Sequence, residues 1–432
     1  MENLIIWGGT IFLILVIVLP YLIKERKSRK ADHARRKEAV RLGATKAVAQ
    51  HPQIDSLACI GCGACVAACP EGSVLGIVSG KAVIINGLKC VGHGLCEEAC
   101  PVEGLVVGLG DLSKRDDIPF MDEHFQTNIT GIYIAGELGG LALIKNAINQ
   151  GSKVVEHISK NIKPSSDDSI KDVLIVGAGP AGLSAALTAK KNNLSCQLLD
   201  QQGAGGTILQ YPRKKLVMTK PVEIPLYGTL TKPEYFKEEL LEIWEKIEEK
   251  FDIKPVVGEK LHDIKRENGH FEVTTQNGTN KAQTVVLALG RRGTPRKLNV
   301  PGEEQSKVMY KLMDAETYQN NHVLVVGGGD SAIEAAMGLA RQKGNVVTLS
   351  YRKEQFFRIK TRNEERVNKM IKEKTLNVMF SSGVKEIGKT DVVINYQDKE
   401  QRIKNDYVFI FAGGEPPFGL LKKMGIQFGS DS

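Results

Sequence analysis

Cysteine is scarce outside one short stretch of the chain, and this scarcity excludes a disulfide-stapled secreted protein. Of the eight cysteines, seven lie between residues 59 and 100, and only Cys196 lies elsewhere. Thiols grouped in this way are typical of metal ligands and favour a reducing cytoplasm. The sequence also has no low-complexity tract. Its 432 residues, 42% of them hydrophobic, are enough for about two to four globular domains with buried cores.

Excess charge is nearly absent outside residues 24–41. The whole chain has a formal net charge of +8, and this segment holds nine Lys or Arg against Glu25, Asp32 and Glu38, which is +6 and leaves +2 for the rest. A nearly neutral remainder lacks the basic surface that nucleic-acid binding needs, so no nucleic-acid partner is expected. A basic segment directly after an apolar run is instead typical of a membrane flank.

Residues 4–23 contain no charged side chain, and they predict one transmembrane helix. Twenty helical residues span about 30 Å, the thickness of the hydrocarbon core of a bilayer. A cleaved secretory signal is not expected, because the chain lacks a basic start and a small-residue cleavage site. The basic flank predicts a single-pass protein of the cell membrane with the bulk of the chain in the cytoplasm. Residues 24–50 are expected to form a charged helical stalk.

The seven grouped cysteines have the spacing of iron–sulfur ligands. The first group reads Cys-x-x-Cys-x-x-Cys-x-x-x-Cys-Pro, and the second has two spaced cysteines followed by Cys-Pro. This pattern resembles two-cluster bacterial ferredoxins, in which the fourth cysteine of each group ligates the other cluster. Zinc is the weaker alternative, because its ligands usually form two separated Cys-x-x-Cys pairs. We assign one cluster to Cys59, Cys62, Cys65 and Cys100, and the other to Cys69, Cys90 and Cys96.

His93 occupies the position, three residues after Cys90, where a further cysteine belongs. Imidazole replaces thiolate in some clusters and raises the reduction potential, so His93 is a candidate ligand. The other interpretations are a cluster with three irons, a corner filled by water or another residue, or a His93 that is only a polar loop residue. In each case we expect one 4Fe-4S cluster and a second cluster, 4Fe-4S or 3Fe-4S, of different potential.

Residues 172–200 predict a dinucleotide-binding fold. An apolar strand over 172–176 leads into Gly-Ala-Gly-Pro-Ala-Gly and then into an alanine-rich helix. The three glycines serve a tight turn, close approach of the pyrophosphate, and packing of helix on strand, and the helix N-terminus attracts the phosphate charge. An acidic residue at the end of the next strand is placed to bind a ribose diol. The expected binding residues are Gly177, Gly179, Pro180, Ala181, Gly182 and Asp200.

A second fold of the same construction follows. A strand over 322–326 leads into Gly-Gly-Gly-Asp-Ser-Ala, a helix, and a strand over 345–350. Counted along the chain, the ribose-binding acid of the first fold corresponds to Ser350, and basic residues come next. Loss of the acid beside a basic cluster favours a 2′-phosphate on the ribose, and therefore NADPH, with NADH as the alternative. The expected binding residues are Gly327, Gly329, Asp330, Ser331, Ala332, Arg352, Lys353 and Arg358.

Residues 171–420 resemble the thioredoxin-reductase-like flavoproteins. The resemblance depends on ordered motifs: the two glycine turns, Gly-Gly-Thr at 205–207, and the apolar segments 284–290 and 409–415. It implies FAD in the first fold, with Gly206 and Gly290 near it, and a nicotinamide coenzyme in the second. The family's redox Cys-x-x-Cys is missing, because residues 307–321 contain no cysteine. Reduction of a disulfide by a protein dithiol is therefore not expected.

The order of the segments departs from that family. The family's last segment covers the flavin and follows the nicotinamide fold, whereas here a similar sequence, over 122–137, precedes the first glycine turn. We interpret this as a circular permutation, which is tolerated where chain ends lie close together. The resemblance then implies that Gly136 and Glu137 lie near the flavin, and that a helix from Gly140 to Lys160 points its positive end at the isoalloxazine. The alternative is that residues 115–160 belong to the ferredoxin-like domain.

The predicted fold class is α/β, with two Rossmann-like three-layer nucleotide-binding domains, joined to an α+β ferredoxin-like domain and a transmembrane helix. The permutation predicts that Ser432 lies near Lys114, and residues 232–251 are expected to form an amphipathic helix. The predicted segments are 4–23 (transmembrane), 24–50 (stalk), 51–110 (two-cluster domain), 115–163 (flavin-covering segment), 171–305 (FAD domain), 306–410 (NAD(P) domain) and 411–432 (return to the FAD domain).

These features predict a membrane-anchored NAD(P)H oxidoreductase, an iron–sulfur flavoprotein that passes electrons between NAD(P)H, FAD, two clusters and a carrier. The expected carrier is a ferredoxin, a quinone or a membrane redox protein, with either direction of flow. No side chain is nominated as an acid–base catalyst, since the cofactors supply the chemistry. Two alternatives are a flavin-dependent reductase of a small disulfide and a non-catalytic redox sensor at the membrane. The sequence leaves the oligomeric state open, a homodimer included.

Overall fold

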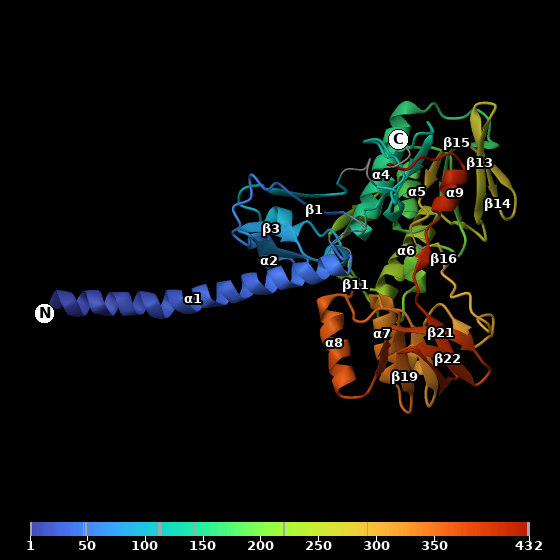
Figure 1. Cartoon of the computed structure of the whole chain (residues 1–432). Helices are drawn as coiled ribbons and strands as arrows, with labels where there is room; N and C mark the ends of the chain where they lie inside the picture. The colour runs from blue at the N-terminus through green and yellow to red at the C-terminus, as the bar shows by residue number, and fades with distance from the viewer. Residues whose placement is uncertain are drawn as a thin grey trace. The chain divides into compact units, whose positions relative to one another are not determined.

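The computed structural model describes residues 2–45, 47, 50–110, 115–141, 143–218, 221–291 and 293–429. The chain divides into two compact units, Met1–Gly108 and Leu109–Ser432. The first unit contains the grouped cysteines, and the second contains both glycine turns. Figure 1 labels the helices and strands of both units.

Helix α1 (Glu2–Arg41) combines the predicted transmembrane segment and most of the predicted stalk in one helix. Between Ile6 and Lys24, every residue whose exposure the structure describes is exposed, and the helix is long and apolar enough to cross a membrane. The prediction that the helical stalk reaches residue 50 is wrong for the described residues that follow Arg41. Gly43 adopts a left-handed conformation, with φ of +68°, and carbonyls of the last turn accept hydrogen bonds from Leu42, Gly43 and Ala44, which ends the helix.

The folded part of the first unit contains, in chain order, β1 (His51–Ile54), α2 (Ala64–Ala68), β2 (Leu75–Val78), β3 (Lys81–Ile84), the 3-10 turn η1 (Gly87–Lys89), α3 (Leu95–Glu98) and β4 (Leu105–Gly108). Strand β1 pairs antiparallel with β4, and β2 forms an antiparallel hairpin with β3. Both short helices follow a glycine in the left-handed conformation. Val74, Leu75 and Leu105 form a small core against the buried cysteines.

The first nucleotide-binding fold lies in the second unit and contains β5 (Ile132–Ile134), the 3-10 turn η3 (Glu137–Gly139), α4 (Ile144–Asn161), β6 (Ile170–Val176), α5 (Pro180–Lys191), β7 (Cys196–Asp200), α6 (Lys237–Phe251), β12 (Val256–Val257), β13 (Leu261–Glu267), β14 (His270–Thr275) and β15 (Thr279–Leu287). Its sheet has the order β12-β7-β6-β15-β14-β13, and β5 pairs with β15. All pairs are parallel except β13 with β14 and β14 with β15.

The centre of this sheet is covered on both faces. Residues 173–176 of β6 are at most 2% exposed, as expected for a central parallel strand. Helices α4 and α5 pack closely, because Gly151 of α4 faces the carbonyl of Ala181, and an added Cβ would lie 2.1 Å from that oxygen. The buried side chains of both helices join one core with β6, β15 and α6.

The second nucleotide-binding fold contains β17 (Val308–Met309), η5 (Ala315–Thr317), β18 (His322–Val326), α7 (Asp330–Ala340), β19 (Val346–Tyr351), α8 (Thr361–Lys372), β20 (Asn377–Phe380), β21 (Ser382–Ile387), β22 (Asp391–Tyr396), β23 (Lys399–Lys404) and β24 (Tyr407–Ile410). A parallel sheet has the order β17-β24-β18-β19-β20, and β21, β22 and β23 form a separate antiparallel sheet. Both predicted nucleotide-binding folds therefore have the mixed α/β architecture.

The remaining elements of the second unit are η4 (Gly206–Gln210), β8 (Leu216–Met218), β9 (Val222–Ile224), β10 (Gly228–Leu230), β11 (Glu234–Phe236), β16 (Thr294–Pro295), β25 (Gly414–Glu415) and α9 (Phe418–Lys423). Two predicted helix starts are wrong. Helix α6 begins at Lys237 and not at residue 232, because residues 234–236 pair with β8. Helix α4 begins at Ile144 and not at Gly140, because Gly140 and Leu143 both have positive φ.

The predicted approach of Ser432 to Lys114 falls on residues outside those that the structure describes. Described residues a few positions away on the two segments do meet. Pro119 and Phe428 form an antiparallel bridge, and the N–H of Phe120 donates to the carbonyl of Gln427 at 2.8 Å.

Candidate cofactor sites

The first cysteine pocket is lined by the four cysteines that were predicted to share a cluster: Cys59, Cys62, Cys65 and Cys100. Backbone N–H groups face two of their sulfurs. The N–H of Ala82 lies 3.4 Å from Cys59 Sγ, and that of Gly104 lies 3.2 Å from Cys100 Sγ. Hydrogen bonds to sulfur are one of the means by which proteins set the potential of a cluster. The donor set therefore fits an iron–sulfur cluster.

The second pocket is lined by the residues predicted for the other cluster: Cys69, Cys90, His93 and Cys96. Glu71 also lines it, with its Oε1 3.7 Å from His93 Nε2, and both side chains are more than nine-tenths buried. The side-chain amide of Gln50 donates to the carbonyl of Gly92 at 2.8 Å and so holds the cysteine loop. Glu71 and Gln50 were missed from the sequence, because only contacts across the fold identify them.

The two thiol groups lie close enough to influence each other. Burial raises the pKa of Cys65 to about 11, with further contributions from Cys59 and Cys96. Burial also raises the pKa of Cys96 to about 11, with contributions from Cys69 and Cys90. A coordinated thiol is deprotonated outright, so iron would hold these sulfurs as thiolates. Among the described residues, no three His, Cys, Asp or Glu side chains are arranged to hold a single metal ion.

The first glycine turn requires glycine at two of its predicted positions. Gly177 has a φ of +110°, and a Cβ on Gly182 would lie 1.8 Å from the carbonyl oxygen of Gly177. At Gly179, by contrast, nothing lies within 4 Å of an added Cβ. Helix α5 begins at Pro180, so its first N–H groups border the same open space. This arrangement fits the pyrophosphate of a dinucleotide.

Two further predicted glycines converge on this turn. A Cβ on Gly206 would lie 3.0 Å from Gly179 Cα, and a Cβ on Gly136 would lie 3.1 Å from Ala181 Cβ. The N–H of Gly136 donates to the side-chain oxygen of buried Gln150 at 2.6 Å. Gln150, which the sequence did not single out, therefore fixes the Gly136 turn beside the first glycine turn.

The other residues predicted for the first fold lie at its border. Asp200 ends β7, and its carboxylate accepts hydrogen bonds from the N–H groups of Ala178 and Gln202, both at 2.7 Å. It therefore also supports the glycine turn. Glu137 is exposed at the start of η3. Gly290 lies just beyond β15, with nothing within 4 Å of an added Cβ.

The second glycine turn has similar constraints. Gly327 has a φ of +143°, and a Cβ there would lie 2.5 Å from the carbonyl oxygen of Phe411. The guanidinium of Arg358 lies 3.3 Å from the position of a Cβ on Gly329, so this predicted side chain lies against the turn. Helix α7 has the other predicted residues in its first turn: Asp330, Ser331 and Ala332.

Asp330 has a structural role in addition to its predicted one. Its Oδ1 accepts hydrogen bonds from the N–H of Lys360 at 3.0 Å and from Asn363 Nδ2 at 2.7 Å. Arg352 and Lys353 are exposed in the loop after β19. The structure thus places Arg358 at the turn and leaves the other two basic side chains at the surface.

Strand pairing corrects the predicted counterpart of Asp200. The N–H of Gly177 bonds to the carbonyl of Leu199 at 2.7 Å, and the N–H of Gly327 bonds to that of Ser350 at 3.0 Å. Ser350 therefore corresponds to Leu199, and the prediction that it replaces Asp200 is wrong by one residue. The second fold has one more residue between its two strands, which counting along the chain does not reveal.

Tyr351 occupies the place of the ribose-binding acid. It is 5% exposed, its ring lies 2.1 Å from the position of a Cβ on Gly328, and it stacks on Phe356. Burial raises the pKa of Tyr351. The position thus has no carboxylate. Its absence still favours a coenzyme with a 2′-phosphate on the ribose, and the residue at the corresponding position is Tyr351 and not Ser350.

Ion pairs connect the two nucleotide-binding folds. Lys215 Nζ lies 2.6 Å from Glu334 Oε2 on α7, and Asn363 donates to the other oxygen of Glu334 at 3.0 Å. Arg213 lies 3.4 Å from Asp314. The segment after η4 is therefore fixed to the coenzyme-binding helix.

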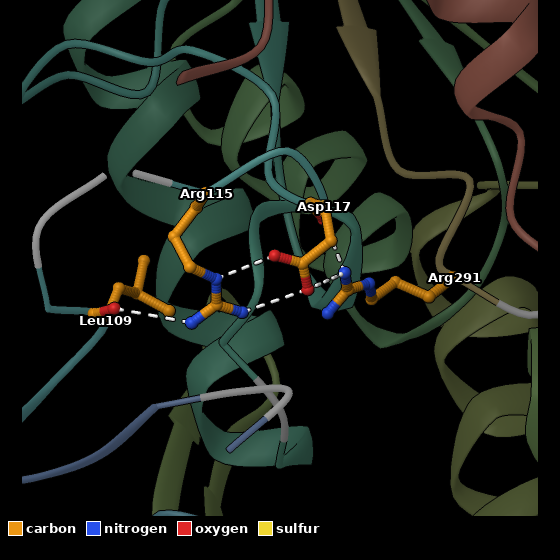
Figure 2. Close-up of polar contacts among 4 residues, drawn as sticks. All are labelled: Leu109, Arg115, Asp117 and Arg291. Carbon is orange, nitrogen blue, oxygen red and sulfur yellow. Dashed lines mark hydrogen bonds and ion pairs between the residues drawn. The ribbon is translucent and has the colours of Figure 1, made fainter. Parts of the chain in front are cut away.

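A polar cluster at the start of the second unit was not predicted (Figure 2). Arg115 donates to both oxygens of Asp117, at 2.6 and 2.9 Å, and Arg291 lies 2.8 Å from the same carboxylate. Arg115 also donates to the carbonyl of Leu109 at 3.4 Å. Burial alone would raise the pKa of Asp117, but the two guanidinium groups outweigh it and lower that pKa. The cluster joins the first residues of this unit to the residue after Gly290.

Leu109 also packs against the predicted flavin-covering segment. Gly140 has a φ of +84°, and a Cβ on it would lie 3.0 Å from Leu109 Cδ2 and 2.8 Å from Ile118 Cδ1. Gly140 directly follows η3, which begins at Glu137. The first residue of the second unit is therefore fixed beside this turn.

Comparison with known proteins identifies two families along the chain. Residues 174–432 match the pyridine nucleotide-disulphide oxidoreductase family, and residues 51–101 match the 4Fe-4S dicluster domain family. A ferredoxin–NADP reductase of Ignicoccus hospitalis is 30% identical over 60% of this chain and 82% of its own length. Ferredoxin–NADP reductase 1 of Christiangramia forsetii is 32% identical over 59% of this chain and 71% of its own length.

A solved relative has a related fold. The bacillithiol disulfide reductase Bdr (YpdA) of Bacillus cereus is 26% identical, covers 60% of this chain and 82% of its own, and superposes with a TM-score of 0.55. The relatives are oxidoreductases by name, as the two nucleotide-binding folds lead one to expect. The chain therefore belongs to the pyridine nucleotide-disulphide oxidoreductase family, as an FAD-dependent NAD(P)H oxidoreductase that also carries a 4Fe-4S dicluster domain.

Proposed function

We propose that the chain is a membrane-anchored, NADPH-dependent iron–sulfur flavoprotein that carries electrons between NADPH, FAD, two clusters and an external carrier. The position of strand β4 supports this most directly. Leu105 lines the first cysteine pocket and Val107 lines the second. Leu109, two residues beyond Val107, packs against Gly140 in the second unit.

Chain length limits the separation of the two kinds of cofactor site. An extended chain covers at most about 3.6 Å per residue, so Val107 to Leu109 spans at most about 7 Å and Leu105 to Leu109 about 14 Å. Gly140, against which Leu109 packs, follows the Glu137 turn that we assign to the flavin. The limit comes from the covalent chain alone and holds for any orientation of the two units.

The proposal includes a circular permutation of the flavin fold. Strand β5 pairs with β15 of the FAD sheet, although the family match begins only at residue 174. The alignments cover 82% of the Ignicoccus and Bacillus relatives and leave about a fifth of each unmatched. Residues 115–163 are a candidate for that part. The bridge between Pro119 and Phe428 supports this, because a permutation that cuts the turn of a hairpin leaves the two strands of the hairpin paired.

The chain's own residues would bind and orient the cofactors. The first glycine turn, with Gly136 and Gly206, would hold FAD, which accepts a hydride and releases single electrons. The second turn would hold NADPH, and the basic residues that follow it, Arg352, Lys353 and Arg358, would bind its 2′-phosphate. His93 would be the fourth ligand of the second cluster, oriented by Glu71 in the way that carboxylates orient other metal-bound imidazoles.

Anchoring in the membrane is supported by helix α1. Its apolar half is long enough to span the hydrocarbon core, and the following turns are basic. The positive-inside rule then places the two units in the cytoplasm. NADPH and reduced thiolates are both available in that compartment.

An anaerobic reduction experiment tests the proposal. The purified full-length chain should show flavin and cluster absorbance that NADPH bleaches, and electron paramagnetic resonance should show reduced clusters after NADPH is added. A Cys59→Ser, Cys62→Ser double variant is the control, because it should lose one cluster signal and keep the flavin bleaching. Bleaching of the flavin alone in the unaltered chain would contradict electron transfer from the flavin to the clusters.

A second candidate function is reduction of a small disulfide by the flavin without a protein dithiol. It is favoured by the similarity to proteins named bacilliredoxin reductase and bacillithiol disulfide reductase. Disulfide-dependent oxidation of NADPH that survives the loss of both clusters would support it. Loss of that activity together with the clusters would favour electron transfer through the clusters.

A further inference from the structure

Helix α1 is fixed along the folded part of the first unit. Asp32 Oδ2 accepts a hydrogen bond from the N–H of Ile77 at 2.9 Å, and the Asp32 side chain is only 6% exposed. Arg35 pairs with Asp32 and donates to Ser73 Oγ at 3.3 Å. Figure 1 shows the folded part of this unit lying along the C-terminal half of α1. These contacts therefore join the helix to the part of the unit that carries the cysteine loops.

The contacts show toward which end of helix α1 the first pocket lies. From Ser73 to Ile77 the chain passes from Arg35 back to Asp32, toward the apolar half of the helix. The hairpin then reaches Gly80, whose carbonyl oxygen lies 2.0 Å from the position of a Cβ on Gly61. Because Gly61 lies between Cys59 and Cys62, the first pocket is at the end of the unit nearer the apolar half of α1.

The second pocket is at the opposite end. The N–H of Leu88, just before Cys90, donates to the carbonyl of Ala44, beyond the last turn of α1, at 3.3 Å. Gln50, which follows, holds the loop of that pocket through Gly92. The two pockets thus lie in order along the helix, with the second one farther from the apolar half.

Helix and strand dimensions give the height of the first pocket above the apolar segment. Nine residues separate Ile23 from Asp32, which is about 14 Å of helix. Strand β2 ends at Val78, and the chain from Ile77 through the Ser79–Gly80 turn extends back by at most about 10 Å. The Gly80 turn therefore lies between about 4 and 14 Å from the level of Ile23, a range that begins within the headgroup layer of a bilayer.

Exposed apolar side chains belong to the loops of the first pocket: Ile60 and Val102 line it, and Leu57 precedes its first cysteine by two residues. Leu57 is 92% exposed, Ile60 is 63% exposed and Val102 is 38% exposed, and Cys62 between them is exposed as well. Three side chains are far fewer than the roughly 20 residues a side of a stable protein interface. They suit insertion into a lipid interface, and the basic residues at 24–30 lie at the same level and attract anionic headgroups.

We propose that the face formed by Leu57, Ile60 and Val102 contacts the membrane interface, where the first cluster exchanges electrons with a quinone dissolved in the bilayer. This inference rests on the proposed function and identifies its external carrier. The overall reaction is NADPH + H⁺ + quinone → NADP⁺ + quinol. The two electrons of the hydride reach the quinone one at a time through the clusters. The quinol takes both of its protons from water, and the flavin releases two protons to water as it is reoxidised, so that the net reaction consumes one proton.

The test compares two quinones with the same headgroup, using the full chain reconstituted in liposomes. One quinone has a long tail and dissolves in the bilayer, and the other has a short tail and dissolves in water. The Leu57→Glu, Ile60→Glu double variant should lower the rate with the long-tailed quinone at least about tenfold, because charges oppose insertion into the interface. Val106→Glu is the matched control, since Val106 is 56% exposed in the same unit and lines neither pocket.

A length variant tests the height without altering the face. Seven helix-forming residues inserted after Lys24 keep the phase of the helix within about 20° and raise the first unit by about 10 Å. We expect the rate with the long-tailed quinone to fall at least about tenfold, while bleaching of flavin and clusters by NADPH and the rate with the short-tailed quinone stay within about twofold.

The outcomes separate this inference from the function on which it rests. An unaltered chain whose clusters NADPH does not reduce would overturn the proposed function itself. Normal cluster reduction with no turnover of the long-tailed quinone would overturn only the inference, and so would turnover that appears only after a membrane protein is added. An equal loss of both quinone activities in the double variant or in the length variant would also overturn it.

Discussion

The carboxylate of Asp117 lies 2.8 Å from the guanidinium of Arg291, although 174 residues separate them in the chain. Arg115 binds the same carboxylate from the other side. The pair holds the entry of the second unit against the loop beyond Gly290. Substitution of Asp117 should therefore loosen the point where the chain that carries the cysteines joins the flavin fold.

We expect Asp117→Asn to lower the free energy of unfolding by about 1–3 kcal/mol at pH 7. The folded-state pKa of Asp117 is lowered from the ordinary 3.8, so its stabilising contribution is complete above that value and is lost as the pH falls through the lowered pKa. Urea unfolding followed by tryptophan fluorescence should show a difference at pH 7 that shrinks below pH 3.8. Exposed Asp116→Asn is the control, and an equal effect there would contradict the prediction.

His93→Cys should change the second cluster without affecting the first. If His93 ligates iron, thiolate in its place should lower the midpoint potential of that cluster by on the order of 100 mV, because imidazole ligation raises potentials. If a three-iron cluster occupies the pocket, the variant should convert its resonance to that of a four-iron cluster. A redox titration followed by electron paramagnetic resonance distinguishes the cases, with Cys196→Ser as the control. Unchanged spectra and potentials would assign His93 to neither role.

Arg358→Ala should weaken the binding of NADPH more than the binding of NADH. The guanidinium lies against Gly329 in the second turn, and loss of a contact to the 2′-phosphate should raise the KM for NADPH about tenfold, while that for NADH changes less than about twofold. Flavin reduction at varied coenzyme concentration measures both constants. Arg362→Ala, an exposed arginine on the following helix, should change neither. A parallel rise in both constants would indicate a structural role for Arg358.

Gly151→Ala should separate α4 from α5 and lower both FAD content and melting temperature. The added methyl would lie 2.1 Å from the carbonyl oxygen of Ala181, and relief of such overpacking typically costs about 1–3 kcal/mol. Gly419→Ala is the matched control, because nothing lies within 4 Å of its added Cβ and alanine is favoured in a helix. Flavin absorbance per protein and a thermal melt provide the comparison. Equal behaviour of both variants would be evidence against this close contact.

The glycine turns and cysteine groups were predictable because each depends on rules that act within a few residues. The constraint at Gly182 follows from its spacing to Gly177, and the assignment of Cys100 to the first pocket follows from the Cys-Pro spacing. The start of α6 was not predictable in this way, because residues 234–236 are held as a strand by β8, which precedes them by some twenty residues.

Long-range contacts account for the other misses. The correspondence of Tyr351 with Asp200 depends on the pairing of β18 with β19. The extra residue between these strands does not change the sequence of the glycine turn, so the motif does not reveal it. Glu71, Gln50 and Gln150 act through side chains that meet their partners only in the folded chain. No local pattern distinguishes such a glutamine from an ordinary surface residue.

Strand β5 reaches its place beside β15 from the N-terminal side of the first glycine turn. A shortened protein that started at residue 170 would leave that edge of β15 without its neighbour. An unpaired strand edge promotes aggregation, because its N–H and C=O groups can pair with another chain. The reductase portion therefore cannot be separated from the rest of the chain at residue 170. Trimming experiments, and any evolutionary loss of the cluster domain, would have to retain the chain from about residue 115 onward.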